Sequence, residues 1–257
     1  MPNDPLTLCV TSGKGGVGKT SITINLAVSL LKEAKKVLIV DGDLGLANVD
    51  IFIGLTPQLS IRDVVQHGYD PKVSLCYPRD GLGVLPASSG VPEMVSLGIE
   101  EQQRLEGYFR ELFKNFDVVL VDTAAGIGTS VIWFNTFVRN NLIVITPEPT
   151  SITDAYALIK VLSKRFRRTH FQILVNLGEN ERECKMVFDQ FNKVAESFLG
   201  VKLDYLGGLM TDPIVSKAVR EQKPFFESTP RAPISKALRE VAFKVMALSN
   251  LPQVKSA

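Results

Sequence analysis

A glycine-rich segment of eight residues, Gly13 to Thr20, constrains the fold of this chain more than any other feature of its sequence. It reads Gly-Lys-Gly-Gly-Val-Gly-Lys-Thr and has the Gly-x4-Gly-Lys-Thr spacing of a phosphate-binding loop. An apolar run, Leu6–Thr11, precedes it, and a segment of helical periodicity, Thr20–Ala34, follows it. Since a phosphate-binding loop joins a buried strand to a helix in this order, the sequence predicts a nucleotide-binding α/β fold.

Short runs rich in Val, Ile and Leu recur along the chain and alternate with longer segments of helical periodicity. The predicted strands are Leu6–Thr11, Val37–Val40, Val118–Val121, Leu142–Thr146 and Ile173–Val175, with weaker candidates at Gly83–Leu85 and Leu203–Gly207. The predicted helices are Thr20–Ala34, Glu101–Lys114, Thr129–Val138, Thr150–Phe166 and Arg182–Phe198, with further helical stretches after Pro213 and Pro233. Strands that are apolar throughout are buried on both faces, so the pattern predicts a mostly parallel, doubly wound α/β sheet with helices on both faces.

The chain has 257 residues, which one large core can accommodate, and we expect a single domain spanning residues 1–257. The least regular stretch, Thr56–Val95, is interrupted by prolines and glycines. It is predicted to be an elaborated surface connection with one short helix near Ile61–His67. Such a connection could serve as a partner-binding face or be a solvated insertion.

Composition and charge narrow the class of protein. A formal net charge of +2 does not by itself indicate a nucleic-acid partner. Cys9, Cys76 and Cys184 are isolated, so they suit a reducing cytosol and no zinc site, iron–sulfur cluster or disulfide framework. The first residues do not resemble a signal peptide, and no apolar run approaches the ~18 residues that span a bilayer. We therefore expect a cytoplasmic location, with any membrane contact peripheral.

The glycine-rich segment predicts the chemistry of a phosphate site. Its glycines allow successive backbone amides to point at phosphate oxygens, and the following helix adds partial positive charge. Lys19 is expected to neutralise the terminal phosphates, and Thr20 offers a hydroxyl to Mg²⁺. The pattern does not require Lys14, for which charge stabilisation of the transferring phosphoryl group is the natural role. The expected cofactor-binding residues here are Gly13, Lys14, Gly15, Gly16, Val17, Gly18, Lys19, Thr20 and Ser21.

Carboxylates follow two of the predicted strands. Asp122 ends Val118–Val121, and Asp41 and Asp43 follow the second strand. The carboxyl ends of parallel strands border the crevice where ligands bind, so Asp122 is expected to hold Mg²⁺ or its water shell. Asp43 is alternatively a turn or cap residue. The small residues of Thr123–Gly128 suit a switch that senses the γ-phosphate.

These segments resemble the MinD/ParA family of positioning ATPases. Gly13–Thr20 has that family's deviant Walker A form, with Lys14 as the signature lysine, and the similarity continues through Val40–Asp50 and Val121–Gly126. Two segments are most similar to the flagellar number and placement regulators of the FlhG (FleN, YlxH) group. They are the sequence Asp-Gly-Asp-Leu-Gly-Leu-Ala-Asn and the segment Asp212–Val219.

The resemblance implies an ATP- and Mg²⁺-dependent switch. ATP binding would join two subunits face to face as a homodimer, with each Lys14 reaching the other subunit's phosphates, and slow hydrolysis would separate them. Asp43 would position the attacking water, and Glu148 would either pair with the partner's Lys14 or be a simple loop carboxylate. The implied residues are Lys14, Lys19 and Asp43 for catalysis, Thr20, Asp41 and Asp122 for Mg²⁺, and Asn176, Asp212 and Pro213 for adenine. Asn176 is alternatively a turn residue at a strand end.

The resemblance also implies a flagellar assembly or regulatory protein as partner, and a position at the inner membrane or cell pole. The alternative is a ParA-like positioner of another cargo that grips DNA through Lys164–Arg168, although cations also suit a solvated helix end. The final helix carries an apolar stripe typical of a core helix, and residues 251–257 are too short and polar to anchor it. The stripe residues are Ile234, Leu238, Val241, Val245 and Leu248.

Two other classes that share the loop fit less well. A GTPase would need an Asn-Lys-x-Asp guanine reader, and Asn192–Ala195 lacks its aspartate, which favours ATP. Related reductases and iron–sulfur carriers need closely paired cysteines, which this sequence lacks.

Overall fold

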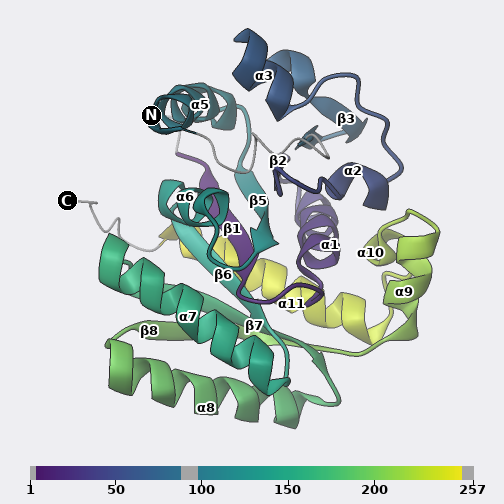
Figure 1. Ribbon diagram of the computed structural model, residues 1–257. Coiled ribbons are helices and arrows are strands. Elements are labelled where there is room, and N and C mark those ends of the chain that lie inside the picture. Colours follow the sequence, from purple (N-terminus) through teal and green to yellow (C-terminus); the bar gives the residue numbers. More distant parts are fainter. Residues whose placement is uncertain (1–3, 88–97, 251–257) are drawn as a thin grey trace.

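The computed structural model describes residues 4–87 and 98–250, which form one eight-stranded sheet with helices on both faces (Figure 1). The strand order is β3-β4-β2-β5-β1-β6-β7-β8, and the paired strands are parallel except for the antiparallel edge pair β3·β4. The strands are β1 (Leu6–Ser12), β2 (Val37–Gly42), β3 (Cys76–Arg79), β4 (Leu82–Leu85), β5 (Val118–Ala125), β6 (Asn140–Ile145), β7 (His170–Gly178) and β8 (Lys202–Met210). The predicted mostly parallel, doubly wound α/β sheet is confirmed.

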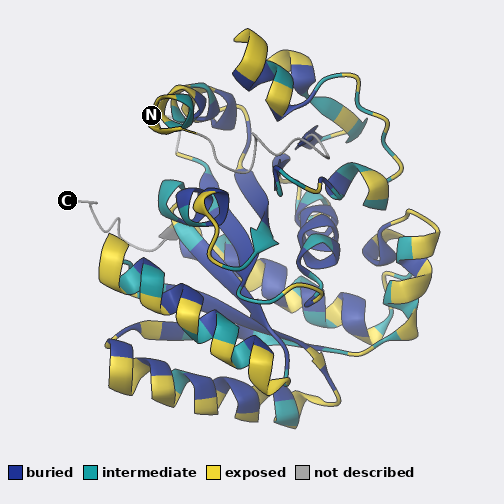
Figure 2. Cartoon of the chain, in the orientation of Figure 1, coloured by how far each residue is buried: buried dark blue, intermediate teal, exposed yellow. Residues whose placement is uncertain are grey.

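Helices cover the sheet because the central strands are apolar on both sides (Figure 2). One face packs against α1 (Lys19–Lys32), α9 (Pro213–Arg220), α10 (Phe225–Ser228) and α11 (Pro233–Ala247). The other face packs against α3 (Ile61–His67), α5 (Ile99–Phe113), α6 (Thr129–Phe137), α7 (Pro149–Phe166) and α8 (Glu181–Leu199). A four-residue helix, α2 (Val49–Phe52), follows β2, and short 3-10 turns lie at Pro71–Ser74 and Leu248–Asn250.

Two sequence predictions about surface elements have different outcomes. The short helix at Ile61–His67 is confirmed, but the prediction of an otherwise irregular connection missed β3, which pairs with β4. Pro78 hides this strand in the sequence because proline lacks an N–H and is confined to edge strands, where β3 lies. Residues 88–95 of the predicted connection lie outside the described residues.

The final helix is a core helix, as predicted. Its apolar stripe is buried against α1 and β8, with each of its five side chains at most 5% exposed. Among the described residues, no helix combines the length and apolarity needed to cross a bilayer.

Candidate functional site: a phosphate loop bordered by carboxylates

The glycine-rich loop between β1 and α1 has the backbone geometry that a phosphate cradle requires. Gly16 and Gly18 have φ angles of 77° and 92°, in the left-handed region that favours glycine. A Cβ built on Gly15 or Gly16 would meet no atom within 4 Å, so the loop is open where a ligand would lie. Gly18 is the N-cap of α1, which directs the helix N-terminus at the same space.

Gly13 is required for a different reason. A Cβ on Gly13 would lie 2.1 Å from the main-chain carbon of Asp154, so the start of the loop is pressed against the backbone of α7. No side chain fits at this contact. The first glycine of the motif therefore serves packing, whereas Gly16 and Gly18 serve the turn.

The sheet order brings the predicted metal ligands together, because β2, β5 and β1 are neighbours and Asp41 is paired in register with Asp122. Asp122 is buried and accepts hydrogen bonds from Thr20 Oγ1 at 2.6 Å and Thr23 Oγ1 at 3.2 Å. Burial raises the pKa of Asp122 to about 6, although Thr20, Lys19 and Thr23 oppose the shift.

Asp41 organises the chain that follows β2. Its carboxylate accepts hydrogen bonds from the backbone N–H groups of Asp43 at 3.1 Å, Asn48 at 3.0 Å and Val49 at 3.2 Å. Burial, with a contribution from the charge of Asp122, raises the pKa of Asp41 to about 8. Asp43 itself accepts a hydrogen bond from the Leu46 N–H at 3.0 Å.

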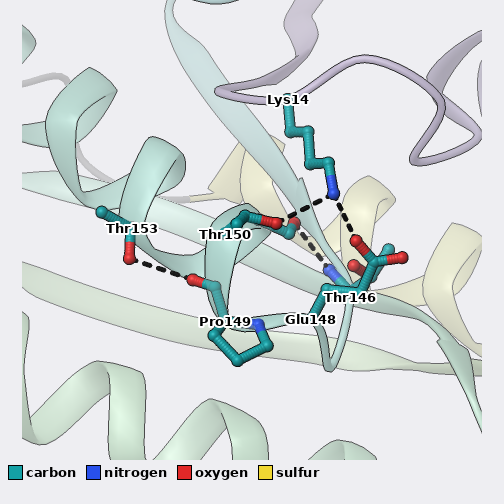
Figure 3. A network of polar contacts seen from close by, with 7 residues as sticks. Lys14, Thr146, Glu148, Pro149, Thr150 and Thr153 are labelled. Atoms are coloured by element: carbon teal, nitrogen blue, oxygen red, sulfur yellow. Dashed lines mark hydrogen bonds and ion pairs between the residues drawn. The ribbon is translucent and has the colours of Figure 1, made fainter.

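Lys19 and Lys14 occupy different environments. Lys19 is buried, its ammonium group donates to Ser12 Oγ at 3.0 Å, and desolvation lowers its pKa. Lys14 extends to the N-terminus of α7, where its ammonium group pairs with the Glu148 carboxylate and donates to Thr150 Oγ1 at 2.9 Å (Figure 3). In this structure Glu148 pairs with Lys14 of its own chain. Pairing of Glu148 with the Lys14 of a second subunit stays a prediction.

A pocket of about 640 Å³ lies beside the loop and accommodates most of the predicted site. Predicted residues that line it are Gly15, Gly16, Gly18, Lys19, Thr20, Ser21, Asp43, Asn176 and Asp212. Predicted residues that do not line it are Gly13, Lys14, Val17, Asp41, Asp122 and Pro213. Asp41 and Asp122 lie behind the lining, where they bond to Asn48 and Thr20, which do line it.

At the other end of the pocket, Asn176 and Asp212 have structural contacts of their own. Asn176 Nδ2 donates to the Val17 carbonyl at 2.8 Å and so connects β7 to the loop. Asp212 caps α9 by accepting from the Ile214 N–H at 2.9 Å, and Pro213 occupies the first turn of that helix. The adenine contacts of these residues stay a prediction.

Sequence reasoning missed several site residues. Thr23 follows Thr20 by three positions, so helical spacing places both hydroxyls on one face and could have revealed it. Ser12 directly precedes the loop, and its hydroxyl both accepts from Lys19 and donates to the Lys14 carbonyl at 2.6 Å. The apolar lining from α2 and α9, including Phe52 and Val215, carries no sequence signal for a ligand.

These residues fit a magnesium nucleotide. Thr20, Asp41, Asp43 and Asp122 supply the hard oxygen groups that Mg²⁺ or its water shell prefers. The open glycine turn, the α1 N-terminus and Lys19 supply the donors and charge that phosphates need.

An Asp122→Asn variant without nucleotide is expected to be more stable than the native protein above pH 6, by up to about 3 kcal/mol. The amide keeps the shape: its oxygen accepts from the Thr20 hydroxyl, and its nitrogen donates to Thr23 Oγ1, whose own proton goes to the Lys19 carbonyl. The folded-state pKa of Asp122 is raised from 3.8 to about 6, so the native protein loses stability as pH rises from 4 to 6, whereas the variant does not. Denaturant unfolding at pH 4, 5, 7 and 8 measures the difference, with exposed Asp80→Asn as control. A less stable variant at pH 7 would contradict this account.

The fold and this site define a P-loop nucleotide-binding α/β protein. A model of the ParA family, described as an NUBPL iron-transfer P-loop NTPase, matches residues 5–246. The chain belongs to the ParA family of P-loop NTPases and is an ATPase of that family.

Individual relatives agree with the family match. The chain is 42% identical over 238 residues to antiactivator FleN of Pseudomonas aeruginosa, covering 93% of this chain and 85% of the relative. It is 32% identical over 238 residues to the flagellum site-determining protein YlxH of Helicobacter pylori, covering 91% and 80%. The crystal structure of the cell division ATPase MinD of Pyrococcus furiosus superimposes with a TM-score of 0.79 at 25% identity, covering 95% and 99%.

Proposed function

We propose that this protein is a switch that forms a homodimer when it binds ATP and separates after slow hydrolysis. The observation that carries the proposal is the position of Lys14, which lies on the nucleotide loop but outside the pocket of its own chain. Lys19 already supplies a buried ammonium group in that pocket. A second loop lysine directed away from it is suited to the phosphates of another subunit.

The chain's own contacts allow Lys14 to change partner at low cost. The Lys14 and Glu148 side chains are 35% and 61% exposed, and exposed ion pairs contribute only about 0.2–1 kcal/mol. A bound magnesium nucleotide would supply the transferable phosphoryl group. Thr20 and the buried Asp122 would hold the metal side, with Asp41 behind them, while Lys19 neutralises the phosphates and Asp43 orients a water.

A Lys14→Ala variant is expected to bind ATP as a monomer, because it keeps Lys19 and the glycine turn but lacks the charge offered to a second subunit. Light scattering with ATP and Mg²⁺ measures the mass of native and variant proteins. Lys164→Ala, an exposed lysine at the far end of α7, is the matched control and should dimerise as the native protein does. An ATP-induced dimer of Lys14→Ala would refute the proposed role of Lys14.

We propose a flagellar role for the switch, supported by its similarity to FleN and YlxH. The corresponding experiment is a pull-down from host lysate with Asp43→Ala, compared with Lys19→Ala and analysed by mass spectrometry. Recovery of flagellar assembly or regulatory proteins on Asp43→Ala alone supports the role. The proposal places the protein in the cytoplasm, with any position at the inner membrane or cell pole supplied by such a partner.

A ParA-like positioner of another cargo is the second candidate. Lys164, Arg165 and Arg167 are exposed, and no ion pair holds them within the part of the chain that the structure describes. Arg168 is held by the protein instead of being offered to DNA, because its guanidinium donates to the carbonyls of Thr136 and Val138 at the end of α6. Binding to random duplex DNA that weakens steeply with salt would favour this candidate over the flagellar one.

Iron transfer, which the family description names, is not the function we propose. Cys9 lies in the core beneath α5 and α6, Cys184 lies on the buried face of α8, and Cys76 lies on the edge strand β3. These three side chains lie in separate parts of the molecule and offer no shared thiolate site.

A further inference from the structure

Two tight turns from distant parts of the chain meet at the rim of the nucleotide pocket. One follows α2 and has Gly54 at φ 67°, and the other follows α9 and has Gln222 at φ 51°. Gln222 Nε2 donates a hydrogen bond to the Ile51 carbonyl at 2.8 Å. A Cβ on Gly54 would lie 3.8 Å from Gln222 Oε1, so the two turns are in contact. In Figure 1, α2 lies next to the α9 and α10 region.

This hydrogen bond connects the two walls of the pocket. The segment between β2 and the end of α2 contributes Leu46, Asn48 and Phe52 to the lining, and α9 contributes Val215 and Val219. Helix α2 has only four residues, and Val49, Phe52, Ile53 and Leu55 pack it and the following turn against the core. Gln222 adds a hydrogen bond at its C-terminal end. The side chain of Gln222 thus attaches the short helix to the longer one.

The same helix connects the metal side of the site to the rim. Asp41 accepts hydrogen bonds from the N–H groups of Asn48 and Val49 at the start of α2, and Gln222 binds the Ile51 carbonyl near its end. The position of α2 therefore depends both on a carboxylate at the phosphate end and on a side chain beside the adenine end.

The backbone at Gln222 is in the left-handed region, as it is at Ala34, Arg167 and Leu177. A residue with φ near +50° after a helix is usually glycine, because a Cβ is unfavourable there. The turn is closed by backbone hydrogen bonds from Gln222 N to the Val219 carbonyl at 3.2 Å and from Lys223 N to the Ala218 carbonyl at 3.1 Å. Glycine would make these bonds without strain, but it could not reach Ile51.

We propose that Gln222 is a positioning residue that holds α2 against α9 and slows the release of bound nucleotide. The inference rests on the proposed function, since it requires a nucleotide in the pocket. Opening the Gln222 contact frees the α2 wall, which carries Asn48 and Phe52, to move away from the base-side wall. Gln222 acts through α2 and contacts no reacting group.

The test is stopped-flow release of N-methylanthraniloyl-ADP, with Mg²⁺, from the full chain. Gln222→Glu keeps the size of the side chain but lacks the donor, and release is expected to be about three- to tenfold faster. Gln222→Lys restores a donor and should release at close to the native rate. Gln66→Glu on α3 is the matched control, because Gln66 is an exposed glutamine away from the pocket that accepts a side-chain bond from Arg62.

Gln222→Gly separates the role in release from a role in stability. It relieves the left-handed backbone, so its thermal stability should equal or exceed that of the native protein while its release is as fast as that of Gln222→Glu. Release from Gln222→Glu and Gln222→Gly within twofold of native would overturn the inference. Failure of the native protein to bind the labelled ADP would instead refute the proposed function.

Discussion

Lys19→Ala is expected to reduce nucleotide affinity by about a hundredfold or more, which is the largest effect we expect from a single substitution in this chain. The Lys19 ammonium group is buried beside the glycine turn and donates to Ser12. Its removal leaves the phosphates without their buried counter-charge, close to the carboxylates Asp43 and Asp122. Isothermal titration calorimetry with ADP and ATP in the presence of Mg²⁺ measures the loss.

The control for this experiment is Lys14→Ala, which removes a lysine from the same loop but outside the pocket and should keep monomeric affinity within a few-fold of native. Thermal unfolding without nucleotide establishes that both variants are folded. A Lys19→Ala protein that is folded and binds ATP with near-native affinity would show that the pocket is not the nucleotide site.

The second large effect is expected at Asp43. Asp43→Ala should bind ATP and dimerise but hydrolyse ATP about a hundredfold or more slowly, because a positioned base or water-orienting group typically contributes that factor. Asp43 lines the pocket and is held by the Leu46 N–H, whereas Asp41 and Asp122 lie behind the lining. Single-turnover phosphate release measures hydrolysis, and light scattering measures the dimer.

The matched control is Asp50→Ala, which removes a half-buried carboxylate from α2, outside the pocket lining, and should leave hydrolysis unchanged. Normal turnover by Asp43→Ala would assign water positioning to another residue. A variant that neither binds ATP nor dimerises would mean that Asp43 acts on binding instead.

The central strands and the phosphate loop could be predicted from the sequence, because both depend on local patterns. Val37–Val40 and Val118–Val121 are apolar on both faces, and that pattern alone specifies doubly buried strands. Gly16 and Gly18 are required by the turn itself. The meeting of Asp41 and Asp122 followed from one further rule, that the carboxyl ends of parallel strands form one edge of the sheet.

Other features depend on contacts between distant segments and could not be predicted in this way. Glu148 lies 134 residues from Lys14, and Ile51 lies 171 residues from Gln222. Nothing in either local sequence specifies such a pairing. Strand β3 was missed for the opposite reason, since Pro78 indicates a break although an edge strand tolerates it.

The close approach of Gly13 to Asp154 packs the phosphate loop directly against the backbone of α7. There is no room for even a methyl group between them, so the two backbones are in direct contact. Helix α7 has 18 residues and is about 27 Å long, and its first turns meet the loop, while its last turn presents Phe166 and exposed cations. Helix α7 thus joins the phosphate loop directly to a surface that carries Phe166 and exposed cations.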